Sequence, residues 1–184
     1  MKTFQLSGEV RQDLGKKATK AVRQAGLIPC VVYGISDPVH FTVTEGDVRK
    51  LIYTPNVYVV ELTVGGKKLN AILKDLQFHP VKDNLLHIDF LEVVENKPVE
   101  IEIPVKSEGL AAGVKMGGKL TQEMRKLRVK GNFTNFPDIL TVNVEELQIG
   151  KTVQVGALSY ENLQIMNNPN NVVFGVKATR GSKK

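Results

Sequence analysis

Apolar residues recur at every second position in several short runs of this chain, and this period constrains the fold most. Val99, Ile101 and Ile103 alternate with polar residues, and the stretch 4–10 shows a similar alternation. Successive side chains of a strand point to opposite faces of a sheet, so these runs predict half-buried strands. Glycine and proline separate the runs at intervals typical of β-barrels and β-sandwiches. The sequence therefore predicts a mainly β protein.

A polar segment that ends at a proline, Glu95–Pro98, divides the chain into two β-rich halves. With 184 residues, each half is long enough to bury a modest core of its own. We therefore expect one domain over 1–94 and a second over 95–178, followed by a basic tail over 179–184.

The expected elements of each half follow from these periods and from the turn residues between them. In the first half we expect strands at 4–10, 30–33, 40–43, 57–64, 67–73 and 85–94, helices at 17–25 and 45–52, and a strand end and loop over 75–82. In the second half we expect strands at 99–105, 127–129, 139–144, 153–155 and 172–176. Thr44 is the expected cap of the second helix, and Asn143 that of a one-turn helix at 144–147.

Composition excludes several classes of protein. No apolar run approaches the roughly 20 residues of a membrane span, and the first ten residues lack the apolar region of a signal peptide. These features favour a cytoplasmic protein. The single cysteine, Cys30, excludes an internal disulfide and a four-cysteine zinc site, and its apolar surroundings predict a buried, inert thiol.

The net charge of +6 favours an anionic partner, but both halves contribute to it. The local signal is stronger in the stretch Gly8–Gly34. Five cations fall within thirteen residues there, namely Arg11, Lys16, Lys17, Lys20 and Arg23. Composition alone fits a solvated helix face and a nucleic-acid site equally well. Gly15, which lets backbone amides join the lysines at a phosphate, and Tyr33, a stacking side chain, favour nucleic acid.

A second group of polar residues lies around the strand predicted at 85–94. Its members are Gln77, His79, Lys82, His87 and Asp89. His87 and Asp89 share the strand face opposite the apolar residues Leu86, Ile88 and Phe90. An ordinary solvated sheet face and contacts with RNA bases and riboses both fit this pattern.

Metal binding and catalysis fit this group less well. His79, His87 and Asp89 are suitable ligand types for a metal, but they form no tight ligand motif. A catalytic His–Asp pair would need a nucleophile, and the sequence has no nucleophile signature. The glycine-rich segment 109–118 lacks the serine or threonine of a phosphate-binding P-loop, so we expect a structural turn there.

Four segments together resemble one known family over nearly the whole chain. They are EVRQDLGKKATKAVRQAGLIPCVVYG, LKDLQFHPVKDNLLHIDFLEV, IPVKSEGLAAGVKMGGKL and DILTVNVEELQIGKTVQV. Their order and spacing are similar to the long, two-domain form of the bacterial large-subunit ribosomal proteins that bind 5S ribosomal RNA, a family that includes the general stress protein Ctc.

The resemblance implies an N-terminal antiparallel β-barrel with short helices and a second, mainly β domain. It implies a non-enzymatic protein without cofactor or metal that binds the minor groove of 5S ribosomal RNA in the central protuberance of the ribosome. The implied RNA contacts are Arg11, Lys16, Thr19, Lys20, Arg23, Tyr33, Gln77, His79, Lys82, His87 and Asp89.

For the second domain we expect contacts with neighbouring ribosomal proteins or with 23S ribosomal RNA. Its basic run Arg125, Lys126, Arg128 and Lys130 has the period of a strand and predicts one charged face. Two other classes of function stay open at this point. One is an enzyme that acts on RNA or on a nucleotide, and the other is a stress-associated interaction module that visits ribosomes transiently.

Overall fold

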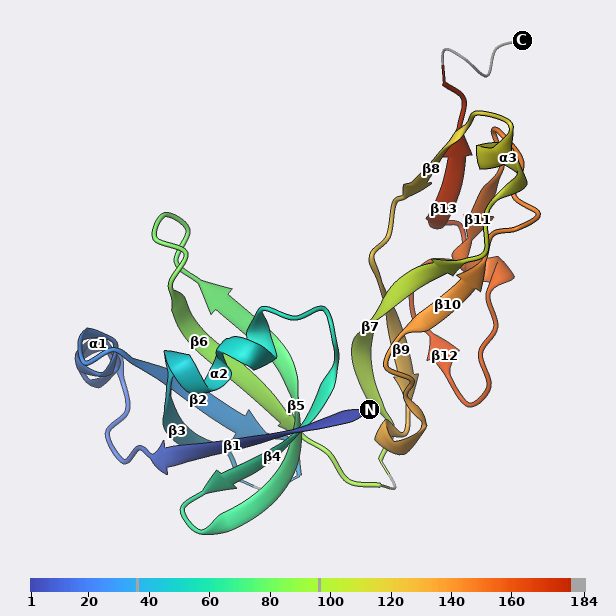
Figure 1. The fold of residues 1–184 in the computed structure, drawn as a ribbon. Coiled ribbons are helices and arrows are strands. Elements are labelled where there is room, and N and C mark those ends of the chain that lie inside the picture. Colours follow the sequence, from blue (N-terminus) through green and yellow to red (C-terminus); the bar gives the residue numbers. More distant parts are fainter. Residues whose placement is uncertain (36, 96, 180–184) are drawn as a thin grey trace. The chain divides into compact units, whose positions relative to one another are not determined.

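The computed structural model describes residues 1–35, 37–95 and 97–179, and it is mainly β, as predicted. Two compact units divide the chain, Met1–Lys97 and Pro98–Lys184 (Figure 1). From residue 180 onward, the expected basic tail lies outside the described residues.

The first unit is a closed six-stranded barrel with the strand order β1-β3-β2-β6-β5-β4. Its strands are β1 (Lys2–Val10), β2 (Leu27–Tyr33), β3 (Val39–Thr44), β4 (Tyr58–Val64), β5 (Lys67–Phe78) and β6 (Leu85–Glu92). β1 pairs with β4 in parallel, and so does β2 with β6, whereas the other neighbours are antiparallel. The closure leaves none of the six strands as a free sheet edge.

The barrel encloses one apolar core. Phe41, Val60, Leu62, Ile88 and Phe90 are fully buried, and the rings of Phe41 and Phe90 lie 5.8 Å apart. These residues belong to three strands, β3, β4 and β6, so the core depends on the closed pairing of the barrel. Cys30 is also fully buried, which confirms the prediction made for it.

Two helices accompany the barrel, α1 (Lys16–Gln24) between β1 and β2, and α2 (Glu45–Ile52) between β3 and β4. Thr44 caps α2 as predicted, since its hydroxyl accepts the backbone N–H of Asp47 at 3.3 Å. Val48 and Leu51 bury the inner face of α2 against the barrel.

The structure corrects the prediction for the segment after residue 73. β5 does not end at Leu73 but continues without a break to Phe78, so the strand end predicted within 75–82 lies at that residue and the loop follows it. Its register with β6 shifts between Leu73 and Asp75, and again between Gln77 and Phe78. A bulge adds one residue to a strand and breaks the strict alternation of sides. The alternation of apolar and polar residues therefore predicted an end of this strand that is too early in the sequence.

The second unit contains two sheets. One has the order β10-β7-β9-β12 and the other β11-β13-β8. Their strands are β7 (Val99–Glu108), β8 (Lys119–Gln122), β9 (Lys126–Gly131), β10 (Leu140–Asn143), β11 (Thr152–Gln154), β12 (Gln164–Ile165) and β13 (Val172–Lys177). Ile101, Ile103 and Val105 of β7 are buried, as their alternation predicted. β8 and β12 were not predicted.

The predicted one-turn helix at 144–147 is absent. In its place is a turn, in which Asn143 Oδ1 accepts the N–H of Glu145 at 2.8 Å and Val144 accepts that of Leu147 at 3.0 Å. Two 3-10 turns, η1 (Phe133–Asn135) and η2 (Val155–Ala157), complete the unit.

The glycine-rich segment is a structural turn, as predicted, and it contains the short helix α3 (Ala112–Lys115). The N–H of Gly113 donates to Leu147 at 2.8 Å, and that of Gly118 donates to Gly113 at 2.8 Å. These amides are used within the fold, so they are not free to hold a phosphate.

Candidate nucleic-acid interface

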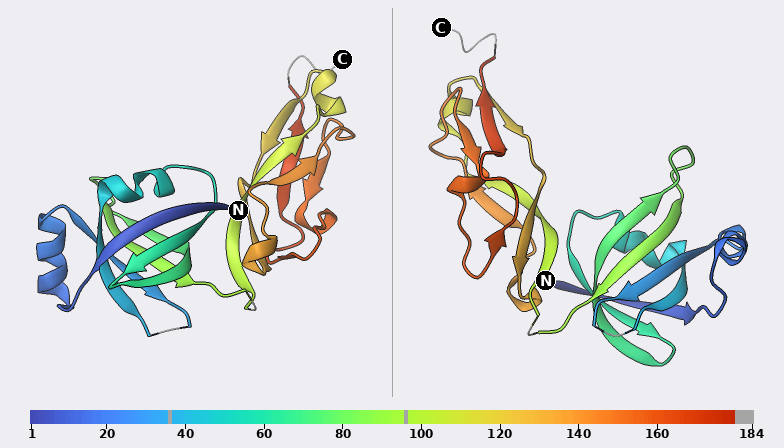
Figure 2. Two further views of the ribbon diagram at one scale, coloured as in Figure 1. Left: turned by 60° about the horizontal axis from the view of Figure 1, so that its bottom comes forward. Right: turned by 180° about the vertical axis from the view of Figure 1, so that it is seen from behind.

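Helix α1 carries the basic cluster on the first unit. Gly15 precedes it with a φ of +100°, and Gly26 follows it with a φ of +77°. Both values lie in the region that glycine adopts without strain, so the two glycines fix where the helix begins and ends. Figures 1 and 2 show α1 at the side of the barrel, between the end of β1 and the start of β2.

None of the residues of α1 is buried. Ala18, Ala21, Val22 and Ala25 recur at helical spacing, but Ala21 and Ala25 are exposed. Apolar packing therefore contributes little to holding the helix in place. Because alanine is small, the exposed Ala21 leaves room for the groove of a nucleic acid to approach the helix closely.

Two arginines tie α1 to the barrel by hydrogen bonds. Arg23 donates from Nε and Nη2 to the carbonyl oxygen of Leu86, at 3.1 and 2.9 Å. Arg11 donates from Nη2 to Thr19 Oγ1 at 3.2 Å and to the carbonyl of Asp13 at 3.1 Å. The hydroxyl proton of Thr19 is not used by the bond from Arg11, so the hydroxyl can still donate to an acceptor.

The lysines of α1 are the cations that face solvent. Lys16, Lys17 and Lys20 are exposed, and none of them pairs with a carboxylate within the described part of the chain. A lysine without an ion-pair partner is available to a phosphate oxygen. The two arginines are already engaged with the protein, so they differ from the lysines in role although they share their charge.

The strand register brings three residues of the second predicted group, Gln77, His87 and Asp89, onto one outward face. Gln77 of β5 lies opposite His87 of β6, and Asp75 lies opposite Asp89. Ile88 and Phe90 alternate with these two residues and are buried in the core, which confirms the outward positions predicted for His87 and Asp89, whereas Leu86 is only half-buried. We call Gln77, His87 and Asp89 the polar face of β5 and β6.

His87 and Asp89 form a close pair on this face. Nδ1 of His87 lies 2.6 Å from Oδ1 of Asp89, and each side chain keeps about a quarter of its surface exposed, at 25% and 26%. The pair is therefore within reach of a ligand that approaches from solvent.

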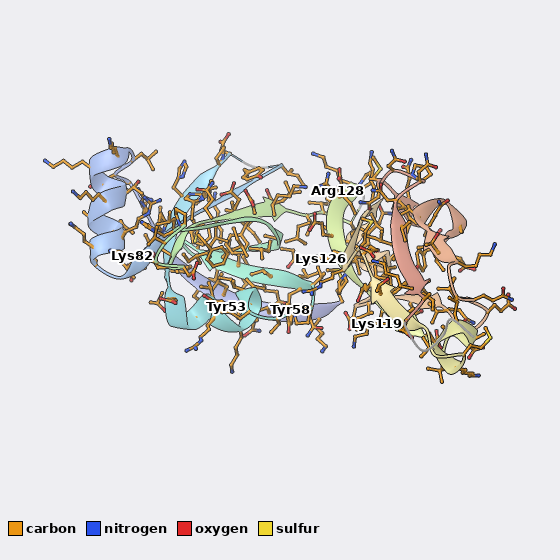
Figure 3. The ribbon with its side chains drawn as sticks, turned by 90° about the horizontal axis from the view of Figure 1, so that it is seen from above. Tyr53, Tyr58, Lys82, Lys119, Lys126 and Arg128 are labelled. Carbon is orange, nitrogen blue, oxygen red and sulfur yellow. The ribbon has the colours of Figure 1, made fainter. Side chains whose placement is uncertain are left out.

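His79 organises the loop that joins β5 to β6. Its Nδ1 accepts the backbone N–H groups of Val81 and Lys82, each at 3.2 Å. The backbone of His79 also bonds to Asn84 and Asp83, at 2.8 and 3.0 Å. Lys82 is exposed on this loop, and Figure 3 shows it on the α1 side of the first unit.

Tyr33 ends β2, in register with Leu91 of the parallel neighbour β6. Desolvation of its hydroxyl, with smaller contributions from the Asp89 and Asp75 carboxylates, raises the pKa of Tyr33 above 10.0. Tyr33 therefore lies within electrostatic reach of the polar face. Its hydroxyl is protonated at neutral pH and can donate a hydrogen bond.

The first unit thus holds the predicted contact residues in two connected groups. Through Arg23 and Leu86, α1 is joined to the strand that carries His87 and Asp89. Sequence reasoning missed two polar neighbours, Asp75 and His40. Asp75 lies opposite Asp89, and His40 lies opposite Val31, which in turn neighbours Asp89. Only the strand pairing reveals these two neighbours, because neither is close to Asp89 in sequence.

Lys126, Arg128 and Lys130 of the predicted basic run lie on one exposed face of β9, whereas Arg125 precedes the strand. Figure 3 labels Lys126 and Arg128 on this strand. Glutamates of β7 face the run, and Arg128 lies 3.4 Å from Glu100 and 3.6 Å from Glu102. The local positive charge is therefore partly neutralised, unlike that of α1.

The described residues offer no other obvious chemistry. Within 1–35, 37–95 and 97–179, no three His, Cys, Asp or Glu side chains gather as a metal site. A search of the same ranges for a helix long and apolar enough to cross a membrane finds none.

Comparison with known proteins identifies both units. Residues 6–90 match the model of the Ribosomal L25p family, and residues 98–180 match that of the C-terminal domain of ribosomal protein TL5. These two matches follow the division of the chain into two units.

Relatives named large ribosomal subunit protein bL25 match along the whole chain. The relative from Azobacteroides pseudotrichonymphae is 56% identical over 184 residues, which cover 100% of this chain and 97% of the relative. Those from Porphyromonas gingivalis and Bacteroides thetaiotaomicron are 52% and 50% identical, each over 100% of this chain and 96% of their own. The chain belongs to the bacterial bL25 family of large ribosomal subunit proteins, in its long, two-domain form, and is a structural ribosomal protein rather than an enzyme.

Proposed function

We propose that the first unit binds 5S ribosomal RNA within the central protuberance of the large subunit, with α1 on the phosphate backbone and the polar face on groove edges. The observation that carries the proposal is the pair of hydrogen bonds from Arg23 to Leu86. These bonds hold an exposed row of lysines beside exposed groups that can recognise bases and riboses.

The two groups suit different parts of an RNA helix. Lys16 and Lys20 are exposed and free of carboxylate partners, so they suit phosphates. The minor groove of RNA is wide and shallow, and it displays 2′-hydroxyls and base edges. The amide of Gln77 and the imidazole of His87, side by side on neighbouring strands, suit such edges.

Binding of the full chain to 5S ribosomal RNA over a salt series, with transfer RNA as competitor, tests this proposal. Lys16→Ala and Lys20→Ala should each lower the slope of log affinity against log salt by about 0.7–0.9, since each removes one phosphate contact. Lys67→Ala, at the exposed start of β5, is the matched control and should leave the slope unchanged. Displacement of the wild-type chain by transfer RNA at equal concentration would refute specific 5S binding.

The same proposal implies that this protein is a permanent component of the large subunit. Large subunits washed in high salt should then keep it in a ratio close to one copy per 5S ribosomal RNA. A ratio well below one, rising only under stress, would instead support a transient visitor.

For the second unit we propose contacts with neighbouring ribosomal proteins or with 23S ribosomal RNA. Lys126 and Lys130 are exposed beside Arg128 on one face of β9. Subunits assembled with Lys126→Glu and Lys130→Glu should show altered chemical footprints on 23S ribosomal RNA. Footprints identical to those of wild-type subunits would leave protein contacts as the role of this face.

A further inference from the structure

Two histidines of the candidate interface are held through the same ring atom by partners of opposite kind. Nδ1 of His79 accepts the N–H groups of Val81 and Lys82, each at 3.2 Å. Nδ1 of His87 lies 2.6 Å from a carboxylate oxygen of Asp89. A backbone N–H donates and a carboxylate accepts, so the two contacts require opposite states of Nδ1.

The state of Nδ1 determines what the other ring nitrogen can do. A neutral imidazole carries one N–H and one lone pair. In His79 the lone pair is on Nδ1, so Nε2 carries the proton. In His87 the proton is on Nδ1, so Nε2 carries the lone pair. Neither Nε2 atom has a hydrogen-bond partner within the described part of the protein, and both side chains are partly exposed.

We infer that the neutral forms of His79 and His87 are held as opposite tautomers and so present one donor and one acceptor to RNA. Nε2–H of His79 donates to an RNA oxygen, and Nε2 of His87 accepts an N–H or O–H of the RNA. The inference rests on the RNA-binding role proposed above and adds the chemical group that each histidine selects.

This assignment also accounts for a carboxylate on a face that binds a polyanion. Asp89 acts through His87 as a positioning residue, because its oxygen holds the proton on Nδ1 and fixes the ring. Among the bases, guanine is the one that offers a donor, its 2-amino group, in the minor groove. The ribose 2′-hydroxyl is the other donor that His87 can meet there.

The tautomers can be measured without RNA. In the full-length protein at mildly alkaline pH, where imidazole is neutral, nitrogen-15 chemical shifts should identify Nε2 as the protonated nitrogen of His79. The same spectrum should identify Nδ1 as the protonated nitrogen of His87. Asp89→Ala should release His87 into a mixture of tautomers and leave His79 unchanged. The reverse assignment for either ring in the wild-type protein would overturn the inference.

Two matched variants test the groups offered to RNA. Asparagine places its amide near the position of Nδ1 and has no atom at Nε2. In His79→Asn the amide oxygen can still accept the loop N–H groups, and in His87→Asn the amide N–H can still donate to Asp89. Each variant therefore keeps the internal contact and loses only the nitrogen offered to RNA. We expect each to bind 5S ribosomal RNA about threefold to tenfold more weakly, the loss of one hydrogen bond.

Modified RNA then identifies the donor that His87 accepts. Inosine in place of single guanosines removes 2-amino groups, and 2′-fluoro in place of single 2′-hydroxyls removes hydroxyl donors. At one modified position, the affinity of the wild-type protein and that of His79→Asn should each fall about threefold to tenfold, whereas the affinity of His87→Asn should fall no further. Whether an inosine or a 2′-fluoro position shows this coupling identifies an amino group or a ribose. If every modification that weakens binding of the wild-type protein weakens binding of His87→Asn by the same factor, the inference is overturned.

Failure of this inference and failure of the proposed function are distinguishable. If the wild-type chain shows no preference for 5S ribosomal RNA over transfer RNA, the proposed function fails, and the tautomers are still decided by the spectra. If the wild-type chain prefers 5S ribosomal RNA but the tautomers are reversed or the coupling is absent, only the inference fails.

Discussion

Arg23 donates two hydrogen bonds to the carbonyl oxygen of Leu86, from Nε at 3.1 Å and from Nη2 at 2.9 Å. The two residues are far apart in sequence, and their contact holds α1 beside β6. Since no side chain of α1 is buried, polar contacts such as this one determine where the basic helix lies. Arg23 is thus a positioning residue as well as a cation.

Arg23→Lys should separate these two roles. Lysine keeps the charge but cannot reproduce the planar pair of bonds, so the contact should lose about 1 kcal/mol. Amide exchange in α1 should become faster and RNA binding weaker, with the salt dependence of binding unchanged. Lys17→Ala is the control and should give the opposite pattern, a lower salt slope with unchanged exchange in α1. Unchanged exchange in Arg23→Lys would show that the tether is dispensable.

Gly15→Ala should destabilise the turn before α1. The φ of +100° at Gly15 is unfavourable for any residue with a Cβ, at a cost of about 1–3 kcal/mol. Thermal unfolding followed on the first unit should show the loss. Gly46→Ala, inside α2 with its nearest atom 3.8 Å from the new Cβ, should be neutral or stabilising. Equal effects from both substitutions would contradict this account of Gly15.

The thiol of Cys30 should make the stability of the protein fall at alkaline pH. Desolvation first, and the Asp89 carboxylate second, raise the pKa of the folded thiol above its ordinary value of 9.0. Below pH 9 the thiol is protonated in both the folded and the unfolded state, and its contribution to the free energy of unfolding is fully present. As pH rises above 9 the unfolded thiol ionises first, which lowers the free energy of unfolding by up to about 1.4 kcal/mol per pH unit.

Chemical denaturation at a series of pH values compares wild type with Cys30→Ala. The difference between the two slopes above pH 9 is the contribution of the thiol, since all other titrating groups are shared. Thiol reagents should label the wild-type protein only at its unfolding rate. Fast labelling of the native protein would mean that Cys30 is accessible.

Gly113→Ala should destabilise the second unit by roughly 1–3 kcal/mol. A Cβ at this position would lie 2.7 Å from the backbone nitrogen of Ile149 and 2.8 Å from the carbonyl carbon of Gln148. Backbone atoms cannot move aside as a flexible side chain can, so the α3 turn would have to shift. Amide exchange at Gly175 and Val176 should become faster, whereas Lys115→Ala, at an exposed site of α3, should leave it unchanged.

Local patterns in the sequence determined most individual elements of this protein. Alternation predicted the buried face of β7 and the outward positions of His87 and Asp89. Thr44 predicted the start of α2, because capping depends on residues close in sequence. The apolar run around Cys30 predicted its burial. In each case the physical cause acts over a few residues, so the sequence displays it directly.

The tertiary structure alone decided which of these elements meet. Parallel pairing of β2 with β6 places Val31 beside Asp89, and the bulges of β5 set Gln77 opposite His87. Period counting cannot supply these registers, because they follow from closure of the barrel and from pairing between distant segments. The tie from Arg23 to Leu86, and the pairing of Arg128 with glutamates of β7, depend on the same long-range registers. The sequence thus determined which side chains this protein offers, and the closed pairing of its strands decided which of them act together.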